Sequence, residues 1–303
     1  MSSKICVIGS SNIDQIAYTK NIPADGETLF GDSFQMGFGG KGANQAVMAG
    51  LLGADVYMIT CLGDDVYKEM TINNYEANNV NTDHIQLVKG ASGVAPIWVD
   101  ATGQNRIIVI PGANNEIDAQ KAISSIEAIG NISVLVGQCE IPMEVNHEVF
   151  QYAKSNAVTT IFNPAPASDI KESDFKCIDY FTPNETEASY YLDKKVESKT
   201  EIEEAAKTFL AKGVKNIVIT LGPKGLYFAN SEESFFIDVY SLKNKVIDTT
   251  GAGDAFNGAF AYALSNKLKI KDALEFSNKV AAISTTKAGA ANAMPKLDEV
   301  EVY

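Results

Sequence analysis

The stretch Asp248-Thr249-Thr250-Gly251-Ala252-Gly253-Asp254 closes a strand-like run and opens a helix. Lys245–Ile247 precedes it, and apolar residues follow it at helical spacing, namely Phe256, Phe260, Ala263 and Leu264. The Gly-Ala-Gly turn removes bulky side chains at the helix start, so several backbone N–H groups can point at one position. The helix dipole adds to them, and the position is therefore suited to an anion.

Asp254 places a carboxylate in the first helical turn, beside that anion position. A carboxylate there repels phosphate unless it has a chemical role, and accepting a proton from a hydroxyl that attacks phosphorus is such a role. We interpret the stretch as a site for phosphoryl transfer to an alcohol. On this segment alone, a helix capped by Thr and Asp after a glycine turn is an equally good interpretation.

Composition is typical of a globular protein with one large α/β domain. The chain has 303 residues, of which 46% are hydrophobic and 21% charged. The net charge of −13 argues against nucleic acid and anionic membrane surfaces as partners. An anionic substrate such as a nucleotide would then need local cations, supplied by a metal ion or a few lysines.

Cysteine use and the absence of long apolar runs indicate a cytoplasmic protein. The four cysteines are scattered, without a Cys-x-x-Cys pair, and are expected to be reduced: Cys6, Cys61, Cys139 and Cys177. The N-terminal apolar run is too short for a signal peptide, and no run approaches membrane length. Only two histidines are present, so a His-rich metal site or a Ser-His-Asp hydrolase is not expected.

Strand-like and helical patterns alternate along the chain and predict a doubly wound, mostly parallel sheet covered on both faces. The expected strands are Lys4–Gly9, Asp55–Thr60, Ser133–Gly137, Val158–Phe162, Cys177–Thr182 and Asn216–Leu221. The expected helices are Asn44–Leu52, Ile117–Ile129, Glu144–Lys154, Glu201–Lys212, Asp254–Ser265 and Asp272–Thr286.

Two β-like stretches interrupt this alternation, Glu27–Phe38 and Gly93–Ile110. The second contains two apolar runs around Asp100–Gln104, which is typical of a hairpin with a glycine-containing turn. Insertions of this length are often lids over active sites. We expect a small β-sheet lid formed by about residues 15–38 and 93–110, within a single domain of residues 1–303.

Two segments near the N-terminus offer polar groups to a small polyol. Asn12 and Asp14 follow the first strand, where ligands of doubly wound sheets bind, and can hydrogen-bond vicinal hydroxyls. The glycine-rich segment Gly37–Ala46 leads into a helix and presents the amide of Asn44, but it lacks the spacing of a P-loop. Each segment has a structural alternative, a polar loop and a tight turn, respectively. Glu140, at a strand end, faces either the same pocket or solvent.

Three later segments suit a nucleotide. Asn184 and Glu187 lie three residues apart at a helix start, which suits a hydrated Mg²⁺ carrying nucleotide phosphates or, alternatively, a capping box. Thr220–Gly225 ends a strand in a glycine-bounded turn, the place for a nucleotide phosphate or ribose. Lys287–Ala291 follows the last long helix, and its free carbonyls can face a cation or an adenine ring. Asn163–Ala167 we interpret as a structural turn.

Taken together, and in this order along nearly the whole chain, the segments resemble the ribokinase branch of the pfkB carbohydrate-kinase family. The strongest signatures are Gly39–Ala46 and Asp248–Asp254. The resemblance implies a ribokinase-like fold and an ATP-dependent sugar kinase, and D-ribose phosphorylated at its 5-hydroxyl is the expected reaction.

The resemblance also implies residue roles. Asp254 would be the general base, and the amides of Gly251, Ala252 and Gly253 the anion hole. The sugar contacts would be Asn12, Asp14, Gly40, Lys41, Asn44, Glu140 and Asp254. The nucleotide contacts would be Asn184, Thr220, Gly222, Lys224, Gly225, Gly253 and Asn278, with Glu187 in the magnesium region.

Family members place a potassium ion between two loops, which implies ligands here from Asp248, Thr250, Ser284, Lys287 and Gly289. One departure matters, because Ala293 stands where many ribokinases carry a further serine ligand. The resemblance implies ATP with Mg²⁺, potassium as an activating cation, and a homodimer formed through the lid.

Alternatives to a ribose kinase remain open at this point. Another sugar or nucleoside kinase of the same family would act on fructose, 2-deoxyribose or adenosine. A nucleoside kinase needs an apolar wall for the base, for which Phe34, Phe38 and Trp98 are candidates. A non-catalytic sugar sensor on the same scaffold is disfavoured, since a sensor need not keep Asp254 and its Gly-Ala-Gly turn.

Overall fold

A nine-stranded sheet forms the centre of the computed structural model, which describes residues 3–303. Its strand order is β15-β14-β13-β12-β11-β10-β1-β4-β6, parallel throughout except that β14 and β15 are antiparallel to their neighbours. The strands are β1 Lys4–Ile8, β4 Asp55–Ile59, β6 Val80–Asn81, β10 Ile132–Gln138, β11 Thr159–Asn163, β12 Tyr180–Phe181, β13 Asn216–Thr220, β14 Leu226–Ala229 and β15 Ser234–Ile237.

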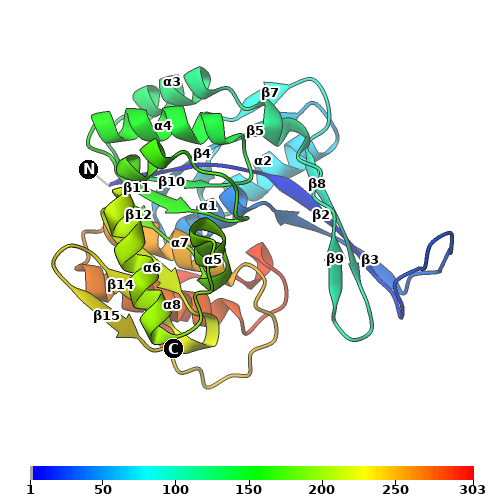
Figure 1. Ribbon diagram of the computed structural model, residues 1–303. Coiled ribbons are helices and arrows are strands. Elements are labelled where there is room, and N and C mark those ends of the chain that lie inside the picture. The colour runs from blue at the N-terminus through cyan, green and yellow to red at the C-terminus, as the bar shows by residue number, and fades with distance from the viewer. Residues whose placement is uncertain (1–2) are drawn as a thin grey trace.

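Helices cover both faces of this sheet (Figure 1). They are α1 Lys41–Leu51, α2 Tyr67–Ala77, α3 Ala119–Ile129, α4 Met143–Ser155, α5 Glu185–Leu192, α6 Lys199–Lys212, α7 Ala252–Ser265, α8 Ile270–Ser284 and α9 Leu297–Val302. Alternate residues of β1 enter two separate cores, because successive side chains of a strand point to opposite faces. Ile5 and Val7 pack with α1, α7 and α8, whereas Cys6 and Ile8 pack with α3, α4 and α6. The predicted doubly wound fold is confirmed.

A separate four-stranded sheet projects from the body, with strand order β3-β2-β8-β9 (Figure 1). Its strands are β2 Asn12–Tyr18, β3 Ser33–Gly39, β8 Gly93–Val99 and β9 Asn105–Ile107. β2 runs parallel to β8, and β3 and β9 are antiparallel edges. We call these four strands the small sheet. A further pair, β5 Cys61–Gly63 and β7 Gln86–Val88, forms a two-stranded parallel sheet.

Several local predictions are wrong in their bounds. Of Glu27–Phe38 only the part from Ser33 is strand, because Gly26 adopts φ 77° in a turn closed by a bond from Glu27 N to Ala24 O. Asn12 and Asp14 lie in strand β2 and not in a loop. The helix expected from Ile117 begins at Ala119, because Asp118 caps it by accepting a bond from Lys121 N.

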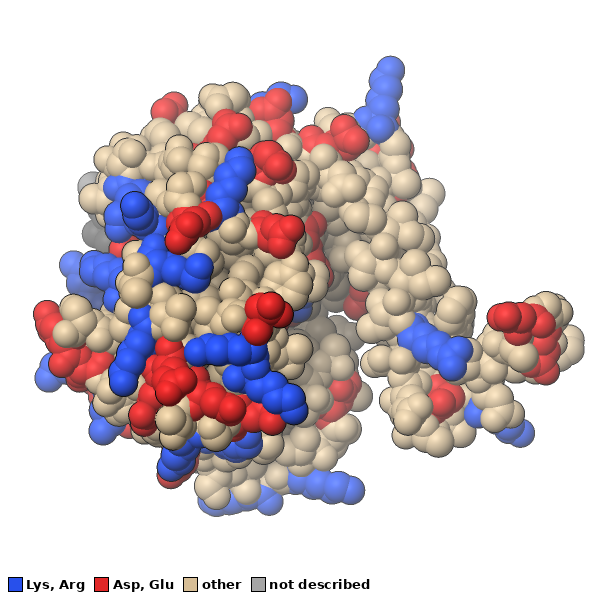
Figure 2. All heavy atoms as spheres, in the orientation of Figure 1, with Lys and Arg blue, Asp and Glu red and all other residues tan. Residues whose placement is uncertain are grey.

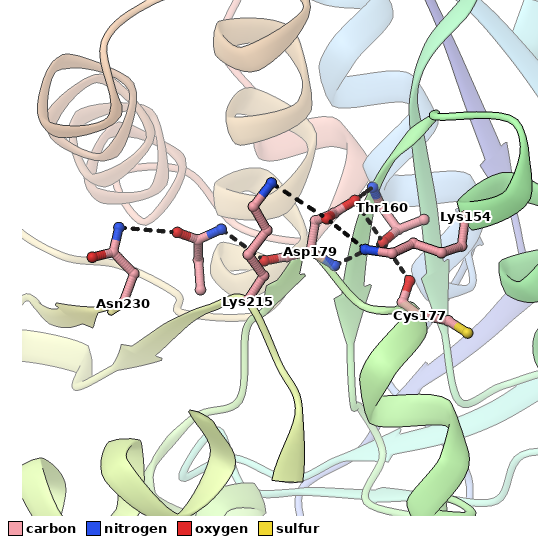
Figure 3. Close-up of polar contacts among 7 residues, drawn as sticks. Lys154, Thr160, Cys177, Asp179, Lys215 and Asn230 are labelled. Carbon is pink, nitrogen blue, oxygen red and sulfur yellow. Dashed lines mark hydrogen bonds and ion pairs between the residues drawn. The ribbon is translucent and has the colours of Figure 1, made fainter. Parts of the chain in front are cut away.

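The expected strand Cys177–Thr182 shortens to Tyr180–Phe181, because Asp179 uses its polar groups outside the ladder (Figure 3). Asp179 N donates to Thr160 Oγ1 at 2.8 Å, and its carboxylate accepts from Thr160 N at 3.0 Å. Lys154 and Lys215 approach the same carboxylate at 3.2 and 3.8 Å. Asn216 Nδ2 donates to Asp179 O, so this buried cluster ties β11, β12 and β13 together where the three strands begin.

None of the helices in residues 3–303 is long and apolar enough to cross a membrane. All four cysteines are free thiols, and two of them, Cys6 and Cys61, are buried in the core. Burial raises the pKa of the Cys61 thiol to about 11, so this thiol is protonated at neutral pH. Cys6 and Cys61 therefore contribute to core packing.

Candidate active site

A cavity of about 170 Å³ opens where β11, β12 and β13 end and α7 begins. This is the edge of a doubly wound sheet at which ligands bind. Its lining consists of Lys41, Asn163, Ala165, Thr182, Asn184, Glu187, Thr220, Gly251, Gly253, Asp254 and Asn257. Six of these were predicted as site residues from the sequence alone: Lys41, Asn184, Thr220, Gly251, Gly253 and Asp254. Glu187 was assigned to the adjoining magnesium region.

The turn before α7 has the geometry of an anion site. Gly251 is the N-cap residue with φ 75°, and a Cβ on it would lie 2.9 Å from Ala290 Cβ, so only glycine fits. Among residues 3–303, no protein acceptor takes a hydrogen bond from the N–H groups of Gly251 and Gly253. The N–H of Ala252 differs, because it donates to Thr249 O at 3.2 Å. Two of the three predicted amides are therefore available to an anion.

Asp254 lies in the first turn of α7 and is only 5% exposed. Its carboxylate accepts hydrogen bonds from two consecutive residues of α1, Asn44 Nδ2 at 2.9 Å and Gln45 Nε2 at 3.0 Å. The α1–α7 contact thus brings the glycine-rich segment at residues 37–46 to the Asp248–Asp254 turn, more than 200 positions away. A buried carboxylate beside free amides is a suitable general base for a bound hydroxyl.

Lys41 supplies the positive charge that the acidic chain requires. Its side chain lines the cavity, and the neighbouring carboxylate of Asp254 raises the Lys41 pKa against the effect of burial, with Glu140 and Glu187 adding to it. The ammonium group is therefore charged at neutral pH. A cation at this position suits a transferring phosphoryl group.

Glu140 is held by hydrogen bonds beside Lys41 rather than solvated. Its Oε2 accepts from Ser10 Oγ at 2.5 Å and from Lys41 N at 2.8 Å. Gly40 precedes Lys41 with φ 90°, and a Cβ on it would lie 3.0 Å from Asn12 N. Glycine at position 40 therefore leaves room for the backbone of β2.

Asp14 and Asn12 face the same region from β2. Burial, and then the charge of Glu140, raise the pKa of Asp14 to about 6. A Cβ on Gly39 would lie 2.4 Å from Asp14 Oδ1, so this glycine makes room for the carboxylate. Asn12 Oδ1 accepts from Asn114 Nδ2 at 2.8 Å, which fixes the orientation of the Asn12 amide. Both side chains are thus placed for hydroxyl groups.

Asn184 and Glu187 form the capping box that the sequence left open as an alternative. Asn184 Oδ1 accepts from Glu187 N, and Glu187 Oε2 accepts from Asn184 N, both at 2.8 Å. Both residues also line the cavity, and burial raises the pKa of Glu187. Within residues 3–303 there is no group of three His, Cys, Asp or Glu side chains that would enclose a metal. A hydrated Mg²⁺ that arrives with phosphates fits this arrangement.

The remaining nucleotide candidates lie in different places, and only some of them are at the cavity. Thr220 lines it, and Gly222 and Gly225 both have positive φ in the turn that follows. Lys224 pairs with Glu185 at 2.9 Å on the surface. Asn278 does not line the cavity. It donates to Asp238 O at 2.7 Å and borders a separate hollow of about 550 Å³ lined also by Ile237, Val239, Tyr240, Ser241, Asp272, Glu275, Phe276 and Lys279.

The two predicted cation-binding loops meet at Asp248. Its Oδ1 accepts from Thr250 N and its Oδ2 from Gly289 N, both at 2.9 Å. Burial would raise the Asp248 pKa, but these hydrogen bonds hold it below its usual value. In the described part of the chain no hydrogen bond reaches four nearby carbonyls, those of Thr250, Ser284, Lys287 and Gly289. One carboxylate with several carbonyls suits a large monovalent cation, whereas the Lys287 ammonium pairs with Glu299.

Sequence reasoning missed several polar residues of the site. Gln45, Asn163 and Asn257 are buried next to Asp254 and its turn. Gln45 bonds to Asp254, and Asn257 Nδ2 donates to Gly253 O at 2.8 Å. Asn163, interpreted as part of a structural turn, lines the cavity. Only their places in the sequence pointed to two of these residues, because Gln45 follows Asn44 and Asn163 ends a strand.

Comparisons with known proteins identify the family of the chain. The model of the pfkB family carbohydrate kinases matches residues 2–297. The ribokinase of Bacillus subtilis is 42% identical over 299 residues, which cover 98% of each chain. The deoxyribokinase of Salmonella typhi is 35% identical over 301 residues, 99% of this chain and 98% of that one. The structure of Arabidopsis thaliana ribokinase complexed with ribose and ATP has a TM-score of 0.93 at 29% identity, covering 100% and 98% of the two chains.

The chain belongs to the pfkB family of carbohydrate kinases. Its full-length relatives make it an ATP-dependent sugar kinase of the ribokinase branch, as the motifs predict.

Proposed function

We propose that this enzyme transfers the γ-phosphoryl group of ATP to the 5-hydroxyl of D-ribose. The observation that carries the proposal is the position of Asp254. Its buried carboxylate lies beside the free N–H groups of Gly251 and Gly253, in a cavity whose other wall carries Lys41. A primary hydroxyl bound next to Asp254 can give up its proton while it attacks phosphorus. The two amides and Lys41 then stabilise the charge that develops on the phosphoryl oxygens.

The sugar would occupy the side of the site nearest the small sheet. Asn12, Asp14, Asn44 and Glu140 offer acceptors and amides to its hydroxyls, and Asn44 Oδ1 is buried without a hydrogen-bond partner in residues 3–303. A sugar hydroxyl would satisfy it. Phe34 and Trp98, two of the three candidates for the wall of a nucleoside base, are exposed on the small sheet. The polar groups of Asn12, Asp14, Asn44 and Glu140 support ribose rather than adenosine as the substrate.

The nucleotide would approach from the opposite side. Thr220, Gly222, Lys224 and Gly225 would contact its phosphates or ribose, and Asn278 with the 550 Å³ hollow marks the direction of the base. Mg²⁺, bound to ATP, would neutralise the phosphates near Asn184 and Glu187. A cytoplasmic location is part of the proposal.

A coupled ADP-release assay with a panel of sugars tests this substrate assignment. Ribose should give a kcat/KM at least about 10³-fold above adenosine or fructose, because a site that pairs each hydroxyl rejects substrates that leave buried groups unpaired. 2-Deoxyribose is the informative competitor, since one relative is a deoxyribokinase. Faster turnover of 2-deoxyribose than of ribose would move the chain to that activity, and faster turnover of adenosine would make it a nucleoside kinase.

We also propose potassium as an activating cation at the loops joined by Asp248. The ligands would be Asp248 with the carbonyls of Thr250, Ser284, Lys287 and Gly289, and the bound ion would order the turn that presents the anion-hole amides. Ala293 is fully buried and has no hydroxyl to add, so binding should be weaker than in chains with serine there.

Potassium should therefore raise kcat several-fold over sodium or choline at matched ionic strength, since general screening does not distinguish these cations. Steady-state rates in the three chloride salts give the comparison. Equal rates in potassium and choline would refute the ion site and leave Asp248 as a cap of its turn.

We propose that the small sheet is a lid that closes the sugar-binding side of the cavity. It would also pair with the small sheet of a second copy of the chain. Figure 2 shows the small sheet standing off the body across a hollow, with few charged side chains on the surface in view. Large apolar side chains are exposed on the small sheet and on the segments that adjoin it, among them Phe30, Phe34, Met36, Ile107, Ile108, Val109 and Ile110. An exposed apolar sheet with open edge strands is a surface that proteins usually cover.

Light scattering at micromolar concentration should accordingly give the mass of a homodimer. Ile108→Lys, which places a charge on the exposed face, should shift the population toward the monomer. Val302→Lys on α9, which also places a charge on an exposed apolar position, is the matched control and should leave the mass unchanged. A fully active wild-type monomer at this concentration would contradict the lid dimer.

A further inference from the structure

Gln45 touches the reacting carboxylate without touching the cavity. Its Nε2 donates to Asp254 Oδ1 at 3.0 Å, while the neighbouring Asn44 donates to Oδ2 at 2.9 Å. Gln45 is fully buried. It can therefore influence a bound substrate only through the residues that it contacts, among which Asp254 is the proposed base.

The orientation of the Gln45 amide is determined by its neighbours. An ionised carboxylate only accepts hydrogen bonds, so Gln45 must turn its NH₂ group toward Asp254. The same nitrogen also donates to Asn163 Oδ1 at 3.1 Å, and Gln45 Oε1 accepts from Gln138 Nε2 at 2.8 Å. Asn163 Nδ2 in turn donates to Thr182 O at 3.2 Å. Each of these three amides therefore has one orientation that satisfies its hydrogen bonds. We call Gln138, Gln45 and Asn163 the amide relay.

The relay anchors the carboxylate to the central sheet. Gln138 is the last residue of β10 and Asn163 the last of β11, and the two are directly paired in the strand register. Room for Gln138 exists because residue 9 is glycine, where a Cβ would lie 2.0 Å from Gln138 Oε1. The ends of two adjacent strands thus hold Gln45, and Gln45 holds Oδ1 of Asp254.

We propose that Gln45 is a positioning residue for phosphoryl transfer, which fixes the plane of the Asp254 carboxylate so that an oxygen faces the attacking hydroxyl. The inference rests on the proposed function of Asp254 as general base. A carboxylate held from α1 alone, by Asn44, can rotate about its bond to Cβ. Loss of the second hydrogen bond therefore misaligns the base for proton transfer but leaves the sugar and nucleotide contacts in place.

Gln45→Met removes the amide and keeps a side chain of similar length. We expect kcat to fall roughly 10–100-fold, because small displacements of a reacting group are costly, with the KM values for ribose and ATP within about twofold of wild type. Asn216→Leu is the matched control. It removes a buried amide from the Asp179 cluster at the opposite edge of the sheet, and it should lower the melting temperature without lowering kcat.

Gln45→Glu supplies a readout that a purely structural role would not affect. Two carboxyl groups at hydrogen-bond distance share one proton, so the introduced carboxyl donates to Asp254 when neutral and repels it when ionised. The charged groups around the pair are Lys41 on α1, Glu140 after β10 and Glu187 on α5. We expect kcat of this variant to fall with rising pH over a range in which wild-type kcat is constant.

Gln45→Met with kcat within twofold of wild type would overturn the proposal, as would Gln45→Glu with the wild-type pH profile. If Gln45→Met does not fold, the isosteric Gln45→Glu decides the question alone. A wild-type chain that releases no ADP with any sugar would instead refute the proposed function itself.

Discussion

Asp254→Asn should lower kcat by roughly 10²–10⁴-fold, the usual range for loss of a general base, while ATP and ribose KM change little. Asparagine has nearly the same shape, but it cannot take the proton of the attacking hydroxyl. The hydrogen bonds around residue 254 predict a second effect of this substitution, on the stability of the protein. Asn44 and Gln45 both present N–H donors to this side chain, and the new amide nitrogen would face one of them.

The free energy of unfolding of Asp254→Asn should therefore drop by about 1–3 kcal/mol, the cost of an unsatisfied buried donor. Glu69→Gln is the matched control, since Glu69 is an exposed carboxylate in the first turn of α2. It should change neither kcat nor stability appreciably. An Asp254→Asn variant that keeps more than about a third of wild-type kcat would show that Asp254 is not the base.

Asp14→Asn is expected to raise the ribose KM by roughly 10–100-fold, which corresponds to losing hydrogen bonds to a charged acceptor. The ATP KM should not change, because Asp14 lies on β2, away from the residues assigned to the nucleotide. The Asp14 carboxylate accepts no hydrogen bond from residues 3–303, so it is available to two sugar hydroxyls. Initial rates over a matrix of ribose and ATP concentrations separate the two constants.

The pKa of Asp14 also predicts how the ribose KM changes with pH. Burial and Glu140 raise that pKa from 3.8 to about 6. The wild-type ribose KM should increase as pH falls through about 6, where the carboxylate becomes a neutral acid, and Asp14→Asn should abolish this dependence. We expect the opposite pH trend for the stability of the unliganded protein. A raised carboxyl pKa stabilises the folded state only while the group is protonated.

That stabilisation is complete below pH 3.8 and is lost as pH rises to about 6. At pH 7.5 Asp14→Asn should accordingly unfold with a higher midpoint than wild type, since the asparagine has no charge to desolvate. Ribose KM that is constant from pH 5 to 8, together with an unchanged unfolding midpoint in the variant, would contradict the assigned role of Asp14.

The parts of the site that could be predicted from sequence are those with local signals. The turn at residues 248–254 combines glycines, a carboxylate and a following helical pattern, and the structure forms an αL residue and a helix start at that place. The strand–helix alternation likewise predicted the parallel sheet. Such features depend on neighbours along the chain, which a single sequence displays.

Features that depend on distant pairing could not be predicted in this way. Asn12 and Asp14 read locally as a loop, but β2 pairs with β3 and with β8, whose partner residues begin about 80 positions later. Gln45 carries no motif of its own, and its role appears only when α1 packs beside α7 and the ends of β10 and β11. The strand predicted over Cys177–Thr182 is shorter in the structure because Asp179 hydrogen-bonds to Thr160 of another strand, which is again a distant pairing.

The position of the transferred phosphate tests the central claim most directly. The enzyme would be incubated with ATP and ribose, and the sugar product examined by ³¹P NMR with proton coupling. Phosphate on the primary 5-hydroxyl couples to the two protons of a CH₂ group, so we predict a triplet-like phosphomonoester signal that grows together with ADP. In Asp254→Asn the signal should grow roughly 10²–10⁴-fold more slowly. A doublet from phosphate on a secondary carbon, or inorganic phosphate in place of a sugar phosphate, would contradict the account.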